Sequence, residues 1–150
     1  MKVGDVIRWN NFPDPRYSQP PGKARWFVCL GKTSSVTPSV MIYIHTTTTQ
    51  IQHYPPGGPR ARNPHLLFNA GSFGFEEPCV LDFSEDPYSY PESDINKNIS
   101  NIEIKETLDK NTLIIIYNMI FDSPHIPKIT KRIIRESLNL NVVLWLPVAA

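Results

Sequence analysis

RWFVCL at residues 25–30 and VMIYI at residues 40–44 are the two segments that decide the fold class. Both are short runs of aromatic and β-branched residues, which is typical of central strands and too short for helices. Three further segments have the same character and predict additional strands: Val3–Trp9, His65–Phe68 and Cys79–Phe83. The first half of the chain is therefore predicted to form a sheet.

Polar and proline-rich segments separate these strands. Asn10–Gly22 holds four prolines, which excludes a helix or a central strand and predicts a long surface loop. Four consecutive threonines, Thr46–Thr49, are expected to begin a polar turn. Tight turns are expected at Gly71–Phe75, and the acidic segment Glu85–Asn98 is expected to be a surface connection.

The pattern becomes helical after residue 105. Asp109 is placed to cap a helix whose apolar residues recur at helical spacing, at Leu113, Ile116, Tyr117 and Ile120. A second helix is expected after Asp122 or Ser123 as cap, entered through Pro124 and Pro127. Its core face would carry Ile129, Ile133 and Ile134, and a basic stripe would lie on another face: Lys128, Lys131, Arg132 and Arg135.

Short strands followed by helices indicate an α+β fold, mainly β, with a small curved antiparallel sheet and C-terminal helices. At 150 residues the chain fits one domain, which we place at residues 1–140, followed by an apolar tail at 141–150. Cys29 and Cys79 lie in apolar runs and are expected to be reduced core thiols. With no secretory signal and no apolar run near the ~20 residues of a membrane helix, a cytoplasmic location without a membrane span is expected.

The charge is unevenly distributed. Residues 1–75 hold eight Lys or Arg and two Asp or Glu, a net charge of +6, whereas residues 76–150 have a net charge of −5. This asymmetry is typical of a protein with a basic face for a polyanion. Two oppositely charged faces that attract each other, or a partner subunit, would give the same pattern.

The motifs of several enzyme classes are missing. The sequence has no HExxH, CxxC, Walker loop, GxGxxG or GxSxG, so we predict no metal site, no nucleotide site, no cofactor and no nucleophilic triad. The polar residues that remain cluster around predicted strand ends: Arg16, Tyr17, Lys23, Arg25, His45–Gln50, Arg60, Arg62 and His65.

These residue types suit cleavage of RNA without a metal. Such cleavage needs a base for the ribose 2′-hydroxyl, a cation or donor for the charged phosphorane and an acid for the leaving 5′-oxygen. The fork of an arginine matches phosphate oxygens, and Phe12 or Tyr17 could stack on unpaired bases. The alternative is that these residues have no catalytic role, because threonines favour strands and an arginine at a strand start is usually a surface residue.

The order of segments resembles the MazF/PemK-like family, also called Kid/CcdB-like, over roughly residues 3–138. The similar segments are GDV (Gly4–Val6), KARWFVCL (Lys23–Leu30), VMIYIHTTTTQIQ (Val40–Gln52), GFEEPCVLDF (Gly74–Phe83) and IKETLDKNTLIIIYNMI (Ile104–Ile120). The resemblance implies an SH3-like barrel and a toxin of a toxin–antitoxin system, acting as a metal-independent endoribonuclease on single-stranded RNA. It also implies a homodimer and an antitoxin protein as partner.

The resemblance also assigns roles to residues. Arg25 and Thr48 stand where the family commonly places its catalytic Arg and its catalytic Thr or Ser, and a slip in register would put Thr46 or Thr47 in place of Thr48. RNA-binding roles are expected for Arg16, Tyr17, Lys23, Gln50, Arg60 and Arg62. The chain departs from the family at Trp26, where a proline is usual, and at Thr107, where a glycine is usual.

Two other functions stay open from the sequence. The first is a non-catalytic SH3-like module that binds RNA or a protein partner, because the family includes members that do not cut RNA. The second is a structural or interaction protein.

Overall fold

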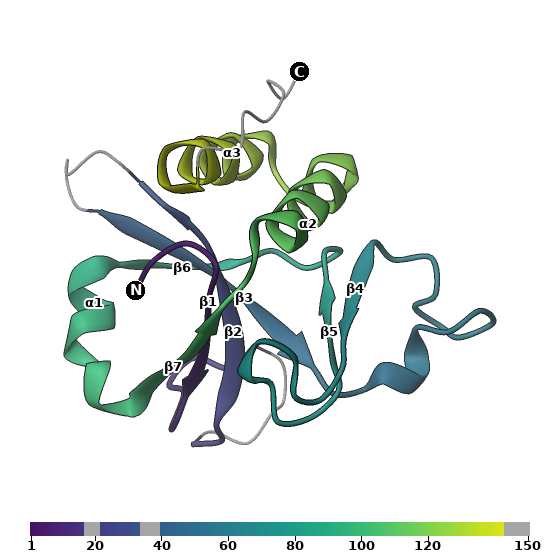
Figure 1. The fold of residues 1–150 in the computed structure, drawn as a ribbon, viewed down its shortest axis with the longest axis horizontal. Helices are drawn as coiled ribbons and strands as arrows, with labels where there is room; N and C mark the ends of the chain where they lie inside the picture. Colours follow the sequence, from purple (N-terminus) through teal and green to yellow (C-terminus); the bar gives the residue numbers. More distant parts are fainter. Residues whose placement is uncertain (17–21, 34–39, 143–150) are drawn as a thin grey trace.

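The computed structural model describes residues 1–16, 22–33 and 40–142, with side chains as far as Leu140. It contains a curled antiparallel half-barrel followed by two C-terminal helices (Figure 1). The strands are β1 (Asp5–Trp9), β2 (Arg25–Lys32), β3 (Met41–Thr48), β4 (His65–Phe68), β5 (Cys79–Asp82), β6 (Tyr88–Pro91) and β7 (Ile102–Thr107). The helices are α1 (Glu92–Lys97), α2 (Lys110–Asp122) and α3 (Lys128–Val142), with 3-10 turns at Ile51–His53, Ser72–Gly74 and Ile99–Asn101.

The strand order is β4-β5-β3-β2-β1-β7, and β6 also pairs with β3. All of these pairings are antiparallel. Strand β3 is the branch point, because one of its edges pairs with β2 while the other pairs with β6 over Met41–Ile44 and with β5 over Thr47–Thr48. The predicted fold class, a small curved antiparallel sheet with C-terminal helices, is confirmed.

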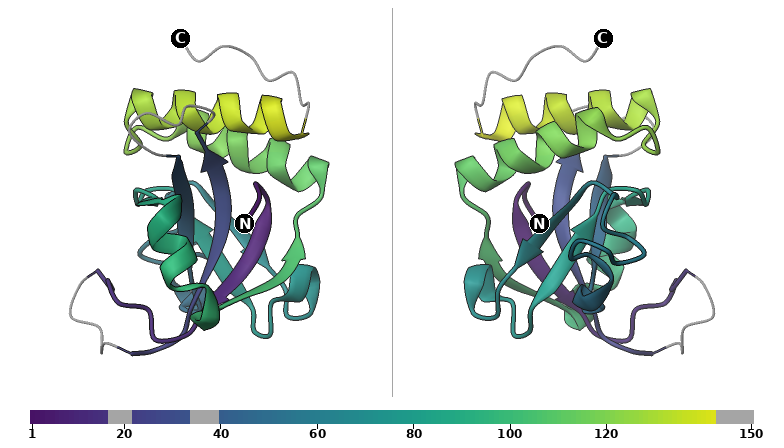
Figure 2. Two further views of the ribbon diagram at one scale, coloured as in Figure 1. Left: turned by 90° about the vertical axis from the view of Figure 1, so that its left-hand side faces the viewer. Right: turned by 90° about the vertical axis from the view of Figure 1, so that its right-hand side faces the viewer.

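Apolar side chains fill both faces of this sheet, because successive residues of a strand point to opposite faces. Val28 and Leu30 lie in one cluster with residues of α2 and α3, whereas Phe27 and Cys29 lie in a second cluster with Ile95 of α1. Figure 2 shows α2 and α3 stacked together across one end of the sheet. Both cysteines are buried and free, as their apolar surroundings predicted.

The first C-terminal helix follows its prediction closely. The Asp109 side chain caps α2 by accepting a hydrogen bond from the backbone N–H of Thr112 at 2.7 Å. The four apolar residues predicted to face the core are all buried: Leu113, Ile116, Tyr117 and Ile120.

The prediction for the second helix was partly wrong. Helix α3 begins at Lys128, directly after Pro127, so neither Asp122 nor Ser123 is its cap. Ile134 is buried, but Ile129 is 57% exposed. A helix turns about 100° per residue, so the five-residue step from Ile129 to Ile134 gives a net rotation of about 140°. Ile129 therefore lies nearly opposite Ile134. Ile126, which precedes the helix, is buried instead.

Three other segments differ from their predictions. Thr46–Thr48 belong to β3 and form no turn, because Thr46 pairs with β2 and the next two threonines pair with β5. The expected surface connection at Glu85–Asn98 contains the strand β6 and the short helix α1. Strand β7 was missed because its IEIKET sequence leaves mostly exposed side chains and gives a weak apolar signal.

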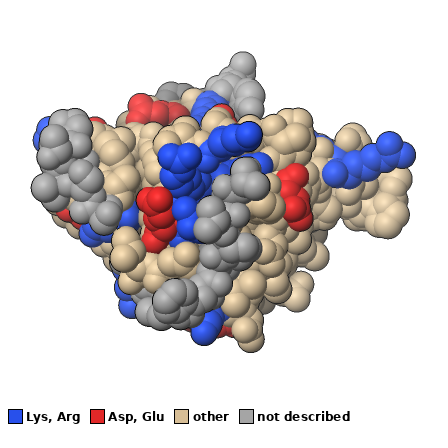
Figure 3. Space-filling view, turned by 90° about the horizontal axis from the view of Figure 1, so that it is seen from above, with Lys and Arg blue, Asp and Glu red and all other residues tan. Residues whose placement is uncertain are grey.

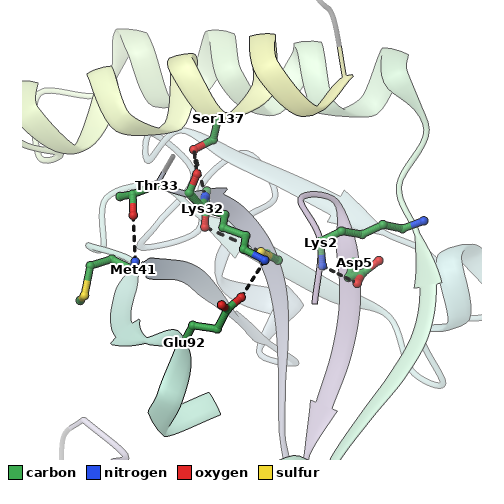
Figure 4. A network of polar contacts seen from close by, with 9 residues as sticks. Lys2, Asp5, Lys32, Thr33, Met41, Glu92 and Ser137 are labelled. Atoms are coloured by element: carbon green, nitrogen blue, oxygen red, sulfur yellow. Dashed lines mark hydrogen bonds and ion pairs between the residues drawn. The ribbon is translucent and has the colours of Figure 1, made fainter. Parts of the chain in front are cut away.

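A pair of reciprocal hydrogen bonds attaches α3 to the sheet (Figure 4). The buried Ser137 hydroxyl accepts from the backbone N–H of Lys32 at 2.9 Å and donates to the Lys32 carbonyl at 2.8 Å. The Lys32 side chain continues outward to an ion pair of 2.7 Å with Glu92, at the start of α1. The end of β2 is thereby linked to helices of both apolar clusters. Within the described part of the chain, no helix is long and apolar enough to cross a membrane.

We predict that Ser137→Ala lowers the free energy of unfolding by about 1–3 kcal/mol, because it removes both hydrogen bonds and leaves the Lys32 backbone groups without this partner. Urea unfolding of wild type and variant measures the difference. Ser93→Ala, at an exposed position of α1, is the matched control and should stay within about 0.5 kcal/mol of wild type. Equal stability of all three proteins would contradict the attachment.

Candidate functional site

A cleft of about 710 Å³ opens where β2 begins and β3 ends. Its lining comes from β1, β2, β3 and β5 and from the loops around residues 12–16, 49–60 and 76–88. Seven of the nine residues predicted from the sequence as catalytic or RNA-binding line it: Arg16, Lys23, Arg25, Thr46, Thr48, Gln50 and Arg60. Of the other two, Arg62 is exposed outside the lining and Tyr17 lies outside the described residues.

Strand register places Arg25, Thr46 and Thr48 on one face of the sheet. Phe27 pairs with Thr46 across β2 and β3, and directly opposed residues of antiparallel strands share a face. Continuing this register by two residues sets Arg25 against Thr48. The Arg25 side chain is partly exposed and has no ion pair or hydrogen bond within the described residues, so its guanidinium is available to a ligand.

The Thr48 hydroxyl is held in a defined orientation. Its oxygen accepts a hydrogen bond from the backbone N–H of Gln50 at 3.2 Å, which leaves the hydroxyl proton as a donor. The Thr46 hydroxyl instead donates to the neighbouring Thr47 carbonyl at 3.3 Å. Of the two threonines, Thr48 is therefore the one whose proton is not already directed at the backbone.

Arg16 lines the cleft but is held by the protein itself. Its guanidinium donates to the carbonyls of Asp86 and Pro87 and lies 3.9 Å from the centre of the Tyr88 ring. Its backbone N–H also donates to the Tyr88 hydroxyl at 3.1 Å. These contacts attach the proline-rich loop, at Arg16, to the connection between β5 and β6.

A buried carboxylate that the sequence analysis did not single out lies in the same lining. Asp82 Oδ2 accepts from the Tyr54 hydroxyl at 2.8 Å and from Asn63 at 3.1 Å, and its Oδ1 accepts from the backbone and hydroxyl of Ser84 at 2.9 and 2.6 Å. Burial raises the Asp82 pKa, but these hydrogen bonds outweigh it and lower the pKa overall. The available signal was an acidic residue within an apolar strand, CVLDF, because such a group needs partners when buried.

The cleft carries charges of both signs. Its positive residues are Arg8, Arg16, Lys23, Arg25 and Arg60, and its negative residues are Glu76, Glu77, Asp82 and Glu85. Arg8 is paired with Glu103 at 3.5 Å. All five positive residues come from the basic first half of the chain and all four negative ones from the acidic second half. The cleft is therefore where the opposite charges of the two halves meet.

A second group of basic side chains lies on the face seen from the side of α3 (Figure 3). Two members of the predicted basic stripe are used within the fold, because Lys131 donates to the Phe121 carbonyl at 2.8 Å and Arg135 pairs with Glu136 at 3.6 Å. Lys128 and Arg132 are exposed. Helix α3 packs at the far end of β2 from Arg25, so this face is separate from the cleft.

His45 precedes Thr46 in β3 and lies outside the cleft lining. It is completely buried, and its ring nitrogens lie 2.9 Å from the Thr46 carbonyl and 3.1 Å from the Glu85 carbonyl. Burial lowers the His45 pKa below its ordinary value of 6.5, although both carbonyls act in the opposite direction. His65 also lies outside the cleft lining, with its ring 4.9 Å from that of Tyr54.

The fold and the cleft define a class of protein: an α+β half-barrel with a mixed-charge cleft at the open end of its central strands. Comparison with models of known protein families finds no match, and no curated protein is significantly similar to the chain. The resemblance to the MazF/PemK-like family therefore remains a prediction. Among the described residues, no group of three or more His, Cys, Asp or Glu side chains is placed to hold a metal ion.

We predict that stability falls as the pH drops below about 6.5 because of His45. The folded protein keeps this ring neutral while the unfolded chain takes up a proton, so stability rises with pH in this window, by up to about 1.4 kcal/mol per pH unit. Urea unfolding between pH 5.5 and 7.5 measures the slope, which should flatten in His45→Gln. His125→Gln, at an exposed histidine, should keep the wild-type slope. An unchanged slope in His45→Gln would contradict the prediction.

Proposed function

We propose that the protein is a metal-independent endoribonuclease of the toxin type that cuts single-stranded RNA in this cleft. One observation carries the proposal: Arg25, without a partner of its own within the described residues, lies on the same sheet face as Thr48, and both line the cleft. A planar cation beside a hydroxyl donor, both on paired strands, suits a phosphodiester that gains negative charge during cleavage.

In this proposal the ribose 2′-hydroxyl gives up its proton to water and attacks the adjacent phosphorus. The bond from phosphorus to the 5′-oxygen breaks as that oxygen takes up a proton from water, which leaves a 2′,3′-cyclic phosphate and a 5′-hydroxyl. Arg25 binds the non-bridging oxygens, and Thr48 donates a hydrogen bond to the same phosphate or shares in proton transfer. Thr46, on the same sheet face but with its hydroxyl directed at the Thr47 carbonyl, is the alternative donor. Lys23, Gln50 and Arg60 contact the strand on either side. The strand fixes the Arg25 backbone beside the phosphate. The guanidinium therefore stabilises the extra charge of the phosphorane more than it stabilises the ground state.

The alternative is a module that binds RNA or a protein partner in the same cleft without cutting. Glu76, Glu77 and Glu85 of the lining favour this alternative, because they repel a polyanion and could bind basic groups of a partner. The two functions differ in a single measurable step, cleavage.

We expect wild type to cleave single-stranded RNA in EDTA. Arg25→Ala should lower the single-turnover rate constant of cleavage by about a hundredfold, the usual scale for one transition-state donor, with a smaller effect on RNA affinity. Thr48→Ala should also be slower, whereas Thr48→Ser keeps the hydroxyl and should retain most of the activity. Arg132→Ala, on the exposed face of α3, is the matched arginine control. Single-turnover cleavage followed on gels measures all five proteins.

Equal rates in wild type, Arg25→Ala and Thr48→Ala would remove both residues from the site. Binding of RNA by wild type without cleavage of any RNA tested would favour the binding module.

We also propose that the chain forms a homodimer and pairs with an antitoxin protein, as the resemblance implies. Sedimentation at micromolar concentration should give a species of twice the 17.1 kDa chain mass. A single species at the chain mass would contradict the dimer.

A further inference from the structure

The acidic residues of the cleft lining differ in how far the protein itself uses their carboxylates. Asp82 accepts four hydrogen bonds, and Glu76 forms an ion pair of 3.8 Å with Lys105. The exposed Glu77 has neither a hydrogen bond nor an ion pair within the described residues. Because a carboxylate repels the phosphates of RNA, Glu77 suits an RNA cleft only if it meets N–H donors of the ligand.

An aromatic ring lies beside this carboxylate. Trp26 and Glu77 both line the cleft, and both also line a small hollow at its side, which Glu85 does not reach. The Trp26 side chain is partly exposed, and its ring centroid lies 5.8 Å from that of Phe75. Trp26 directly follows Arg25 in β2. An aromatic ring next to the proposed phosphate contact suits stacking of a base from the same strand.

A constrained turn holds the hollow in shape. Phe73 has a φ of 49°, which is strained for a residue with a side chain, and Gly74 has a φ of 81°. A Cβ at Gly74 would lie 2.7 Å from Lys105 Cβ, so this turn packs directly on β7. The Lys105 ammonium lies 5.7 Å from the centre of the Trp26 ring. Glu77, three residues after Gly74, is thereby kept on the same side of the cleft as the indole.

We propose that Trp26 and Glu77 form a base-binding subsite selective for guanine. The base stacks on Trp26, and the Glu77 carboxylate accepts hydrogen bonds from the guanine N1–H and 2-amino group. The inference rests on the proposed RNA substrate and adds to it the base that the site prefers. Guanine alone among the four RNA bases presents two neighbouring N–H donor groups on its Watson–Crick edge, which a carboxylate accepts in bidentate form. The other bases would set at least one acceptor against the carboxylate.

Binding of RNA probes that cannot be cut tests the inference. Each probe is a single-stranded 2′-O-methyl oligouridylate with one central guanine, hypoxanthine or adenine, and the blocked 2′-oxygen prevents cleavage. Hypoxanthine differs from guanine only in lacking the 2-amino group. Fluorescence anisotropy gives the affinities of wild type, Glu77→Gln, Trp26→Leu and Trp26→Phe. Glu106→Gln, at an exposed glutamate of β7 outside the cleft lining, is the matched control. Cleavage of unmodified RNA in EDTA is measured in parallel.

We expect wild type to bind the guanine probe about tenfold more tightly than the adenine probe, the usual scale for a bidentate base contact, with hypoxanthine between them. Glu77→Gln should lose most of this preference but bind the adenine probe at least as tightly as wild type, because a repelling charge is removed. Trp26→Leu should weaken binding of all three probes about tenfold, whereas Trp26→Phe keeps a ring and should retain most of the affinity. Glu106→Gln should match wild type.

Three results would overturn the inference: equal binding of guanine and adenine by wild type, equal binding of guanine and hypoxanthine, or a guanine preference that survives in Glu77→Gln. The parallel assay separates this failure from failure of the nuclease. A guanine preference that depends on Glu77, without cleavage of any RNA, supports the subsite and overturns the nuclease. Cleavage without this preference does the reverse, and no binding of any probe by wild type overturns both.

Discussion

The structure depends on the fact that one edge of β3 must pair with two different strands. Strand β6 takes the first half of this edge and β5 takes its end, so the chain between β5 and β6 has to cross at the change of partner. His45 stands at this point, and its ring nitrogens lie between the Thr46 carbonyl of β3 and the Glu85 carbonyl of the crossing segment. The curl of the sheet, the path of the β5–β6 connection and the end of β3 that carries the threonines all follow from this branch.

The sequence was informative where one residue pattern had one structural solution. Apolar runs such as RWFVCL gave strands, and the spacing of Leu113, Ile116, Tyr117 and Ile120 gave a helix with the right face buried. The sequence was uninformative where the secondary structure of a segment depended on the strand that pairs with it. Thr46–Thr48 extend β3 because β2 and β5 lie beside them, and Tyr88–Pro91 form β6 because β3 provides an edge. Such pairing partners are remote in sequence and leave no local pattern.

The same distinction applies to the cleft. Arg25, Thr48 and their polar neighbours could be predicted because residues at strand ends gather at one end of a sheet. The roles of the arginines could not, because each depends on long-range contacts. The Arg16 guanidinium donates to carbonyls about 70 positions away, and Arg62 lies outside the cleft lining although it is two residues from Arg60. Asp82 was missed because its partners are assembled only by folding.

The buried cysteines have a consequence for experiments in solution. Burial raises the pKa of Cys29 and of Cys79 to about 12, so neither sulfur is an appreciable thiolate near neutral pH, and oxidants or alkylating reagents have no reactive form to attack in the closed molecule. The two thiols lie in different apolar clusters, on opposite faces of the sheet. The alkylation rate of each cysteine would therefore report how often its own side of the protein opens.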